Sequence, residues 1–171
     1  ISTFLVNAFV EIIRNTPFLI QIYFVFFALP LAGIRLNPTA TGIIALGLNG
    51  GAYAIEIIRG GVESIPKGQT EAGLALGLHP HEVFRLIILK PALRAIYPSL
   101  CSQFILLTLT TAICTSISAY ELTYVGQRIE AETFRSFEVY FSLTMIYLVI
   151  SFATMAALSA LGRWAFNYPQ R

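Results

Sequence analysis

Long uncharged stretches dominate the pattern of hydrophobic and polar positions along this chain. Four of them run without a single charged side chain, at residues 15–34, 36–55, 95–120 and 139–162. A helix that crosses a bilayer needs about 20 mostly apolar residues, and each stretch has 20 to 26. The pattern therefore predicts an all-α, polytopic membrane bundle with about four spanning helices.

The composition supports a membrane protein and argues against a soluble one. Hydrophobic residues make up 56% of the 171 residues and charged residues only 12%, about half the charged share of soluble domains. A chain of this length cannot bury four such helices in water, because small domains keep much of their surface exposed. The net charge of +2 is too small to indicate a nucleic-acid partner.

The loops between the predicted spans carry unequal numbers of basic residues. Eight of the eleven Lys and Arg residues lie before the first span, in the loop 56–94 or after the last span, and three lie in the other loops. Cytoplasmic loops of membrane proteins hold the excess of basic residues. We therefore expect the loop 56–94 and the C-terminus to be cytoplasmic, and the loop 121–138 to face outward.

The long central loop is predicted to hold two short helices. The run Ser64–Lys67 indicates a helix start, and Gly77 is a natural C-terminal cap. Pro80 suits the first turn of a second helix, with Glu82 at its third position. This helix is expected to end before Lys90-Pro91, because the residue before a proline disfavours helix. The two helices together carry many apolar positions, which indicates that the loop packs against the membrane helices or another protein.

The chain lacks the motifs of common enzyme and cofactor sites. Neither lysine lies in a GxxxxGK[ST] loop, and HExxH, CxxC and GxSxG are absent. His79 and His81 have no third metal ligand near them in the sequence. Cys101 and Cys114 lie in one predicted helix about 20 Å apart, too far to form a disulfide. We therefore predict no catalytic residue, metal site or cofactor.

Several short motifs with fixed spacing are spread along most of the chain. They are Glu11-x-x-Arg14-x-Thr16-Pro17-x-Leu19-x-Gln21, Tyr53-x-x-Glu56-x-x-Arg59-Gly60-Gly61, Gly68-Gln69-x-Glu71-Ala72-Gly73-x-x-x-Gly77, Ile87-x-Leu89 and Tyr120-Glu121-Leu122. With these residues the chain resembles the permease subunits of ATP-binding-cassette importers, and most closely their polar amino-acid branch. Gly73 replaces the second alanine of the family's cytoplasmic "EAA" loop, and Lys90 interrupts its Leu-Pro.

The resemblance implies a permease that forms a translocation path and couples to a separate ATPase. The implied contact is a cytoplasmic double-helix coupling loop, residues 64–91, within a single transmembrane permease domain, residues 1–171. The residues implied to carry the coupling are Gly68, Gln69, Glu71, Ala72, Gly73 and Gly77. The branch has one more helix at its N-terminus, so five helices are expected in the full chain, and the start at Ile1 indicates that this helix is missing.

The resemblance also implies partners and a location. The partners are ATP-binding-cassette ATPase subunits, a second permease copy or a related permease, an extracytoplasmic substrate-binding protein, an amino acid as substrate and membrane lipid. The location is the bacterial inner membrane. The alternative is an ATP-independent channel or secondary transporter. A secondary transporter is expected to carry ionisable residues within its spans, whereas all four predicted spans are uncharged.

A substrate path is predicted where the third span ends. This span carries a series of hydroxyls, of which Thr115, Ser116 and Ser118 lie nearest to Glu121. The hydroxyls either bond to backbone carbonyls of their own helix or line a polar path. The Glu121 carboxylate either meets substrate, through the ammonium group of an amino acid or the side chain of a basic one, or pairs with Arg128, or caps the next helix. The branch tends to carry Lys-x-Thr/Ser-Ser where this chain has the run 109–112, Leu-Thr-Thr-Ala.

Overall fold

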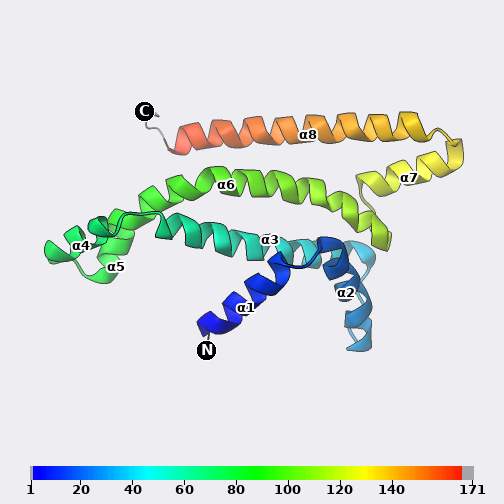
Figure 1. Ribbon diagram of the computed structural model, residues 1–171. Helices are drawn as coiled ribbons and strands as arrows, with labels where there is room; N and C mark the ends of the chain where they lie inside the picture. Colours follow the sequence, from blue (N-terminus) through cyan, green and yellow to red (C-terminus); the bar gives the residue numbers. More distant parts are fainter. Residues whose placement is uncertain (1, 167–171) are drawn as a thin grey trace.

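A computed structural model describes residues 2–166 of the chain (Figure 1), and the fold in this range is helical. Ile1 and Arg171, on which the expectations about the N-terminal helix and part of the basic-residue count rest, lie outside the described residues. The helices in order are α1 (Ser2–Arg14), α2 (Phe18–Leu31), α3 (Pro38–Glu63), α4 (Lys67–Ala75), α5 (Pro80–Glu82), the π-helical segment η1 (Val83–Ile88), α6 (Leu89–Thr110), the 3-10 segment η2 (Thr111–Ile117), α7 (Leu122–Thr133) and α8 (Ser136–Ala165).

Within residues 2–166, three helical segments are each long and apolar enough to cross a membrane. They are Pro38–Glu63, Pro80–Ile117 and Ser136–Ala165, which confirms the helices expected for the second, third and fourth uncharged stretches. Helix α3 begins at Pro38 because the Asn37 side chain accepts a hydrogen bond from the Ala40 N–H at 2.7 Å and proline suits the first turn.

The first uncharged stretch does not form one straight span. The helix within it, α2, has 14 residues, about 21 Å of rise, which is shorter than the hydrocarbon core of a bilayer. It meets α1 at an angle of 111°, so the pair forms a broken span or a re-entrant segment. The break lies at Pro17, which holds an extended backbone conformation directly before α2 and cannot donate to the preceding turn.

The second helix of the long loop was expected to end before Lys90-Pro91. This prediction is wrong, because the helix continues through these residues into α6. Proline is tolerated here because the preceding residues, Val83–Ile88, form a π-helix. Its wider turns move the backbone carbonyls away from the place where the proline ring would clash with an α-helical turn. The result is one helical rod of 38 residues from Pro80 to Ile117.

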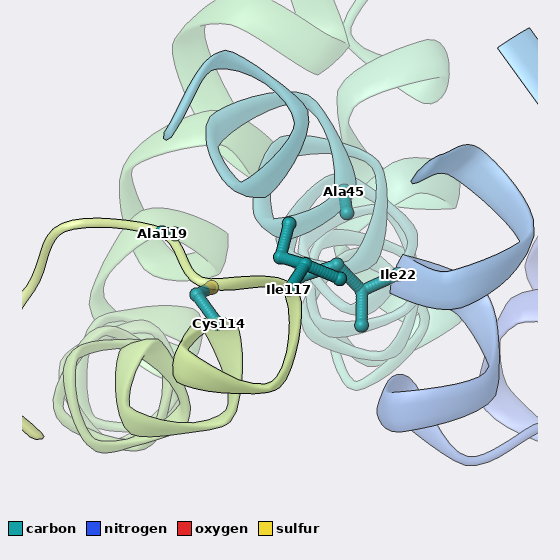
Figure 2. Close-up of a cluster of buried hydrophobic side chains, with 5 residues drawn as sticks. All are labelled: Ile22, Ala45, Cys114, Ile117 and Ala119. Atoms are coloured by element: carbon teal, nitrogen blue, oxygen red, sulfur yellow. The ribbon is translucent and has the colours of Figure 1, made fainter. Parts of the chain in front are cut away.

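Helix α3 lies at the centre of the molecule, packed along α6 and against α1 and α2. Figure 2 shows a small buried cluster where α2, α3 and η2 meet, formed by Ile22, Ala45, Cys114, Ile117 and Ala119. At the other end of α3, Gly61 lets Ile96 of α6 approach, because an added Cβ would overlap the isoleucine side chain. Small residues at such crossings let helix backbones come close.

Helix α8 runs along the outside of the bundle, antiparallel to α6 (Figure 1). It packs against α6 and α7 on one side, and most of its other side chains are exposed. The two cysteines, on α6 and η2, are free thiols, and Cys114 is buried.

Candidate functional site

The loop 64–91 contains a short helix that ends as predicted. Helix α4 stops at Ala75, and Gly77 has a φ of +82°, a left-handed conformation that favours glycine. The Gly77 N–H donates to the Leu74 carbonyl at 2.9 Å, and the next N–H, of Leu78, donates to the Gly73 carbonyl at 3.2 Å. These two bonds complete a C-terminal cap, so the predicted cap at Gly77 is confirmed.

Gly73 sets the distance between α4 and the π-helical segment η1. It is buried, and an added Cβ would lie 2.7 Å from Ile87 Cδ1 and 2.9 Å from Val83 Cγ2. Both distances are shorter than an ordinary carbon–carbon contact. Glycine, at the position where the resembling family has alanine, therefore allows α4 to lie against η1 at closer range.

The other predicted coupling residues lie on the outside of this packed unit. Gly68, Gln69, Glu71, Ala72 and Gly77 are all exposed. Beside them, Leu74 and Leu76 are 46% and 80% exposed. The loop therefore packs on the protein through Gly73 and leaves a mixed polar and apolar surface on its other side.

The second helix of the loop starts with a capping box. The Glu82 carboxylate accepts a hydrogen bond from the His79 N–H at 2.8 Å, and Pro80 holds the first position, as predicted. The rings of His79 and His81 stack with centroids 6.0 Å apart. Among residues 2–166 no group of three His, Cys, Asp or Glu side chains could hold a metal ion.

A buried polar contact fixes the corner between α1 and α2. The Gln21 amide donates to the Ile13 carbonyl at 2.6 Å and to Thr16 Oγ1 at 2.8 Å. Its oxygen accepts from Asn49 Nδ2 of α3 at 3.0 Å, and Asn49 is only 8% exposed. Because buried polar groups are costly without partners, this network holds the 111° bend in place.

Arginine side chains connect the same corner to the other end of α3. Arg14 pairs with Glu56 at 3.3 Å, and Arg59 approaches the same carboxylate at 3.7 Å. Arg59 also donates to Asn7 Oδ1 of α1 at 2.9 Å. Two of the sequence motifs, around Arg14 and around Glu56, are therefore in contact in space.

Glu121 caps helix α7. Its carboxylate accepts hydrogen bonds from the backbone N–H groups of Thr123 and Tyr124 at 2.8 and 2.6 Å. It also accepts from the hydroxyl of Tyr147 on α8 at 3.2 Å, and that hydroxyl lies 2.9 Å from Thr123 Oγ1. Of the three roles considered for Glu121, the structure contains the cap, whereas Arg128 lies 3.9 Å from Glu132. A contact between Glu121 and substrate stays a prediction.

The hydroxyl series divides into two groups. Thr108, Thr110 and Thr111 donate to backbone carbonyls of their own helix at 2.7 to 2.9 Å. Thr115 instead donates to Gln127 of α7 at 3.1 Å, and Ser116 and Ser118 are exposed. The first group follows the local interpretation, and the second lies where η2 turns towards α7.

Ser118 has an unusual backbone conformation. Its φ of +59° is in the left-handed region, which costs a non-glycine residue about 1–2 kcal/mol. Its N–H donates to the Thr115 carbonyl at 2.8 Å. This turn places Thr115, Glu121 and Gln127 near one another at the same end of the bundle. Sequence reasoning did not find Gln127 or Tyr147, because Tyr147 is one of several hydroxyl side chains in the uncharged stretch 139–162 and nothing in the sequence singles it out.

Comparisons with known proteins agree on one family. A family model described as "Binding-protein-dependent transport system inner membrane component" matches residues 3–167. The glutamine transport system permease protein GlnP of Escherichia coli K12 is 41% identical over 157 residues, 91% of this chain and 72% of that protein. The L-cystine permease protein TcyB of Bacillus subtilis is 38% identical over 148 residues, 85% of this chain and 63% of that protein.

Two solved structures share the fold. One, described as an amino acid ABC transporter with histidines, has a TM-score of 0.86 and 32% identity, over 92% of this chain and 73% of that one. An inward-facing form of the MetNI methionine ABC transporter has a TM-score of 0.77 at 20% identity, over 92% of this chain and 72% of that one. Together with the family match, these similarities show that the chain belongs to the inner-membrane components of binding-protein-dependent transport systems.

Proposed function

We propose that this chain is the permease subunit of an ATP-driven importer for a neutral, polar amino acid. The observation that carries the proposal is the loop 64–91, whose α4 packs on η1 through Gly73 and exposes the residues predicted to couple. The similarity to permeases named for glutamine and cystine transport supports the substrate class. The chain supplies the path, and partner ATPase subunits supply the free energy.

The proposed location is the bacterial inner membrane, with the loop 64–91 and the C-terminus in the cytoplasm. The excess of basic residues in these segments supports this orientation. The outer end then carries the Glu121 cap and receives the amino acid from an extracytoplasmic binding protein. A second permease, either identical or related, completes the path.

Coupling is proposed to run through the exposed side of α4. An ATPase that binds Gly68, Gln69, Glu71 and Ala72 pushes on a helix whose opposite side rests on Val83 and Ile87 through Gly73. Because η1 continues without a break into α6, movement of α4 is passed to a membrane helix. ATP shifts the permease between states only as far as it binds one of them better.

The absence of charge favours a neutral substrate. Residues 95–120, which hold the hydroxyl series, contain no Asp, Glu, Lys or Arg, so they offer no fixed charge to a basic or acidic side chain. Thr115, Ser116 and Ser118 offer hydroxyls to an amide or hydroxyl side chain, and Glu121 offers a carboxylate to the ammonium group. The ATP-independent alternative is not favoured, because the family and the relatives belong to binding-protein-dependent systems.

The direct test is uptake by proteoliposomes that contain the permease, its ATPase and its binding protein. We expect labelled glutamine, or another neutral polar amino acid, to accumulate only when ATP is present, with arginine and glutamate as poor competitors. Accumulation without ATP, or without the ATPase subunit, would contradict the proposal.

Coupling is tested with Gly77→Val. Valine strains the left-handed cap, so we expect ATPase association and uptake to fall while the permease still inserts into the membrane. Gly33→Val is the matched control, because Gly33 has the same φ of +82° and equally open surroundings but lies far from the loop. Equal losses in both variants would point to general strain rather than to coupling.

The substrate contact is tested with Glu121→Gln, which keeps the shape and removes the charge. If Glu121 meets the ammonium group, uptake falls sharply while ATP hydrolysis without substrate is unchanged. Glu132→Gln is the control, because Glu132 is exposed and pairs only loosely with Arg128. Normal uptake by Glu121→Gln would leave Glu121 as a cap and place substrate recognition elsewhere.

A further inference from the structure

A groove with a volume of about 870 Å³ opens between α6 and α8, and none of the roles proposed above uses it. It lies at the end of the bundle where α6 begins and α8 ends, which is also the end that carries the loop 64–91 (Figure 1). It is lined by residues of both helices in their antiparallel order. Its chemistry changes steadily along its length.

At the end nearest the loop 64–91, the groove is basic. Arg94 of α6 and Arg163 of α8 both line it, and both residues are exposed. Trp164, next to Arg163, is 81% exposed. Tryptophan and arginine side by side at a helix end are typical of the boundary between headgroups and hydrocarbon.

The middle of the groove is lined by small polar side chains, and its far end is apolar. Ser102 of α6 and Ser159 of α8 lie beyond the arginines, followed by Ile105 and Met155. From Arg94 to Ile105 the helix rises about 16 Å, and from Arg163 to Met155 about 12 Å. Along the lining the two cations, which lie with the rings of Tyr97 and Phe166, are followed by the hydroxyls and then by aliphatic carbon.

The basic end of the groove is held in a fixed shape. The Tyr97 hydroxyl of α6 donates to the Leu158 carbonyl of α8 at 2.6 Å, and the Tyr97 ring lies beside that of Phe166, tilted by 58°, with centroids 5.2 Å apart. Gly162 makes room for this ring, because an added Cβ would overlap it. The two helices are thus joined at Tyr97, which sets the spacing of α6 and α8 along this end of the groove.

We propose that this groove binds one anionic phospholipid of the leaflet on the side of the loop 64–91. The phosphate meets Arg94 and Arg163, the glycerol and ester oxygens meet Ser102 and Ser159, and the upper acyl chain lies on Ile105 and Met155. The order of chemistry in the groove matches the order of chemistry in a phospholipid, and the two arginines select negative charge. Basic pockets between membrane helices are known to hold anionic headgroups.

The inference uses the proposed orientation only to name the leaflet as cytoplasmic. It is tested by native mass spectrometry of the importer complex, purified in detergent with equal amounts of phosphatidylglycerol and phosphatidylcholine. We expect phosphatidylglycerol to be retained over phosphatidylcholine. Arg163→Gln should weaken retention about fivefold, and the double variant with Arg94→Gln more, from the usual worth of a basic residue near anionic lipid. Arg35→Gln, at the opposite end of the bundle, is the charge-matched control.

A second pair of variants tests the groove itself. Ser159→Phe fills the groove and should abolish retention of phosphatidylglycerol. Ala157→Phe, two residues away and therefore on the opposite side of α8, should leave it unchanged. The assay needs no transport, so a failure here leaves the transport proposal standing.

Three results would overturn the inference. The first is equal retention of the two lipids, and the second is equal retention of phosphatidylglycerol by Arg163→Gln and wild type. The third is a wild-type complex that holds no lipid, together with a Ser159→Phe variant that loses subunit association. The last result would show that a protein segment fills the groove.

Discussion

Helices α3 and α8 are both long and apolar, but they are held in place in different ways. In the most apolar window of α3, 28% of the residues are buried within the chain, and in that of α8 only 6%. Helix α3 has Gly61 against Ile96 at one end, Gly42 against Cys114 at the other, and the buried Asn49 between them. Helix α8 has specific contacts mainly at Leu143, Tyr147 and Leu158, which meet Gly126, Glu121 and the Tyr97 hydroxyl of α6 respectively.

The difference shows which part of the permease is specified by this chain alone. The position of α3 follows from close packing and from polar groups that must find partners. Most of α8 instead presents large apolar side chains outward, including Phe137, Phe141, Val149 and Phe152. Their surroundings are lipid or another subunit, so the final position of α8 depends on those surroundings as well.

The largest effect is expected at the crossing of α3 and α6. Gly61→Val places a side chain where Ile96 already lies, and overpacking of this kind costs about 1–3 kcal/mol or more. We expect a clear fall in the melting temperature of the purified permease. Gly60→Ala is the control next door: an added Cβ there meets open space, so it should leave stability unchanged or raise it by about 0.5–1 kcal/mol. Equal melting temperatures would show that this crossing does not position α3.

The next effect is expected from the buried amide on α3. Asn49→Ala leaves the Gln21 oxygen without its donor, at a cost of about 1–3 kcal/mol. Limited proteolysis should then cut more rapidly at the corner between α1 and α2. Asn7→Ala removes an exposed partner of Arg59 and should cost less. A larger effect for Asn7→Ala would show that the arginine contacts, rather than the buried amides, hold the corner between α1 and α2.

A smaller effect is expected from the polar contact of α8 with α7. Tyr147→Phe removes the hydroxyl shared by Glu121 and Thr123, a loss of about 1 kcal/mol. The melting temperature should fall slightly, whereas Tyr140→Phe, on the exposed side of α8, should not change it. An unchanged Tyr147→Phe variant would leave α8 without a measurable polar anchor at that end.

The smallest effect is expected on the outward side of α8. Leu148 is 48% exposed, so Leu148→Ala should change the stability of the single subunit by less than about 0.5 kcal/mol. The same variant measured in the assembled importer shows what lies beside it. If Leu148→Ala lowers stability only in the assembled importer, a partner subunit lies on this side of α8. If it lowers stability neither in the single subunit nor in the importer, lipid lies on this side.

The uncharged stretches predicted the helices of spanning length well where nothing interrupts them. The prediction of a straight span failed at residues 15–34, because a count of apolar residues does not show where a helix bends. The chain bends by 111° at Pro17. The uncharged stretches also gave no warning that Lys90-Pro91 lies within a helix. That outcome depends on the π-helical turns of residues 83–88, which have no simple signature in the residues themselves.

The candidate site divides in the same way. The cap at Gly77 and the helix start at Pro80, with Glu82 at the third position, were predictable because each is set by residues within one turn. The packing role of Gly73, the partners of Arg14 and Gln21, and the contact of Glu121 with Tyr147 were not, because these partners lie on other helical segments. Arg14, for example, has Glu11 one turn away in sequence, yet it pairs with Glu56 across the bundle.

The unbroken helix from Pro80 to Ile117 has a mechanical consequence. It touches α3 most tightly at Ile96, where Gly61 allows no space, so this contact can act as a fulcrum. Thirteen residues separate Ile96 from Val83, beside α4, and twenty-one separate it from Ile117. Because the arm towards Ile117 is the longer of the two, a rod that tilts about this point moves its far end farther than its near end. A small push on α4 would then become a larger, opposite displacement at the Thr115–Glu121 turn.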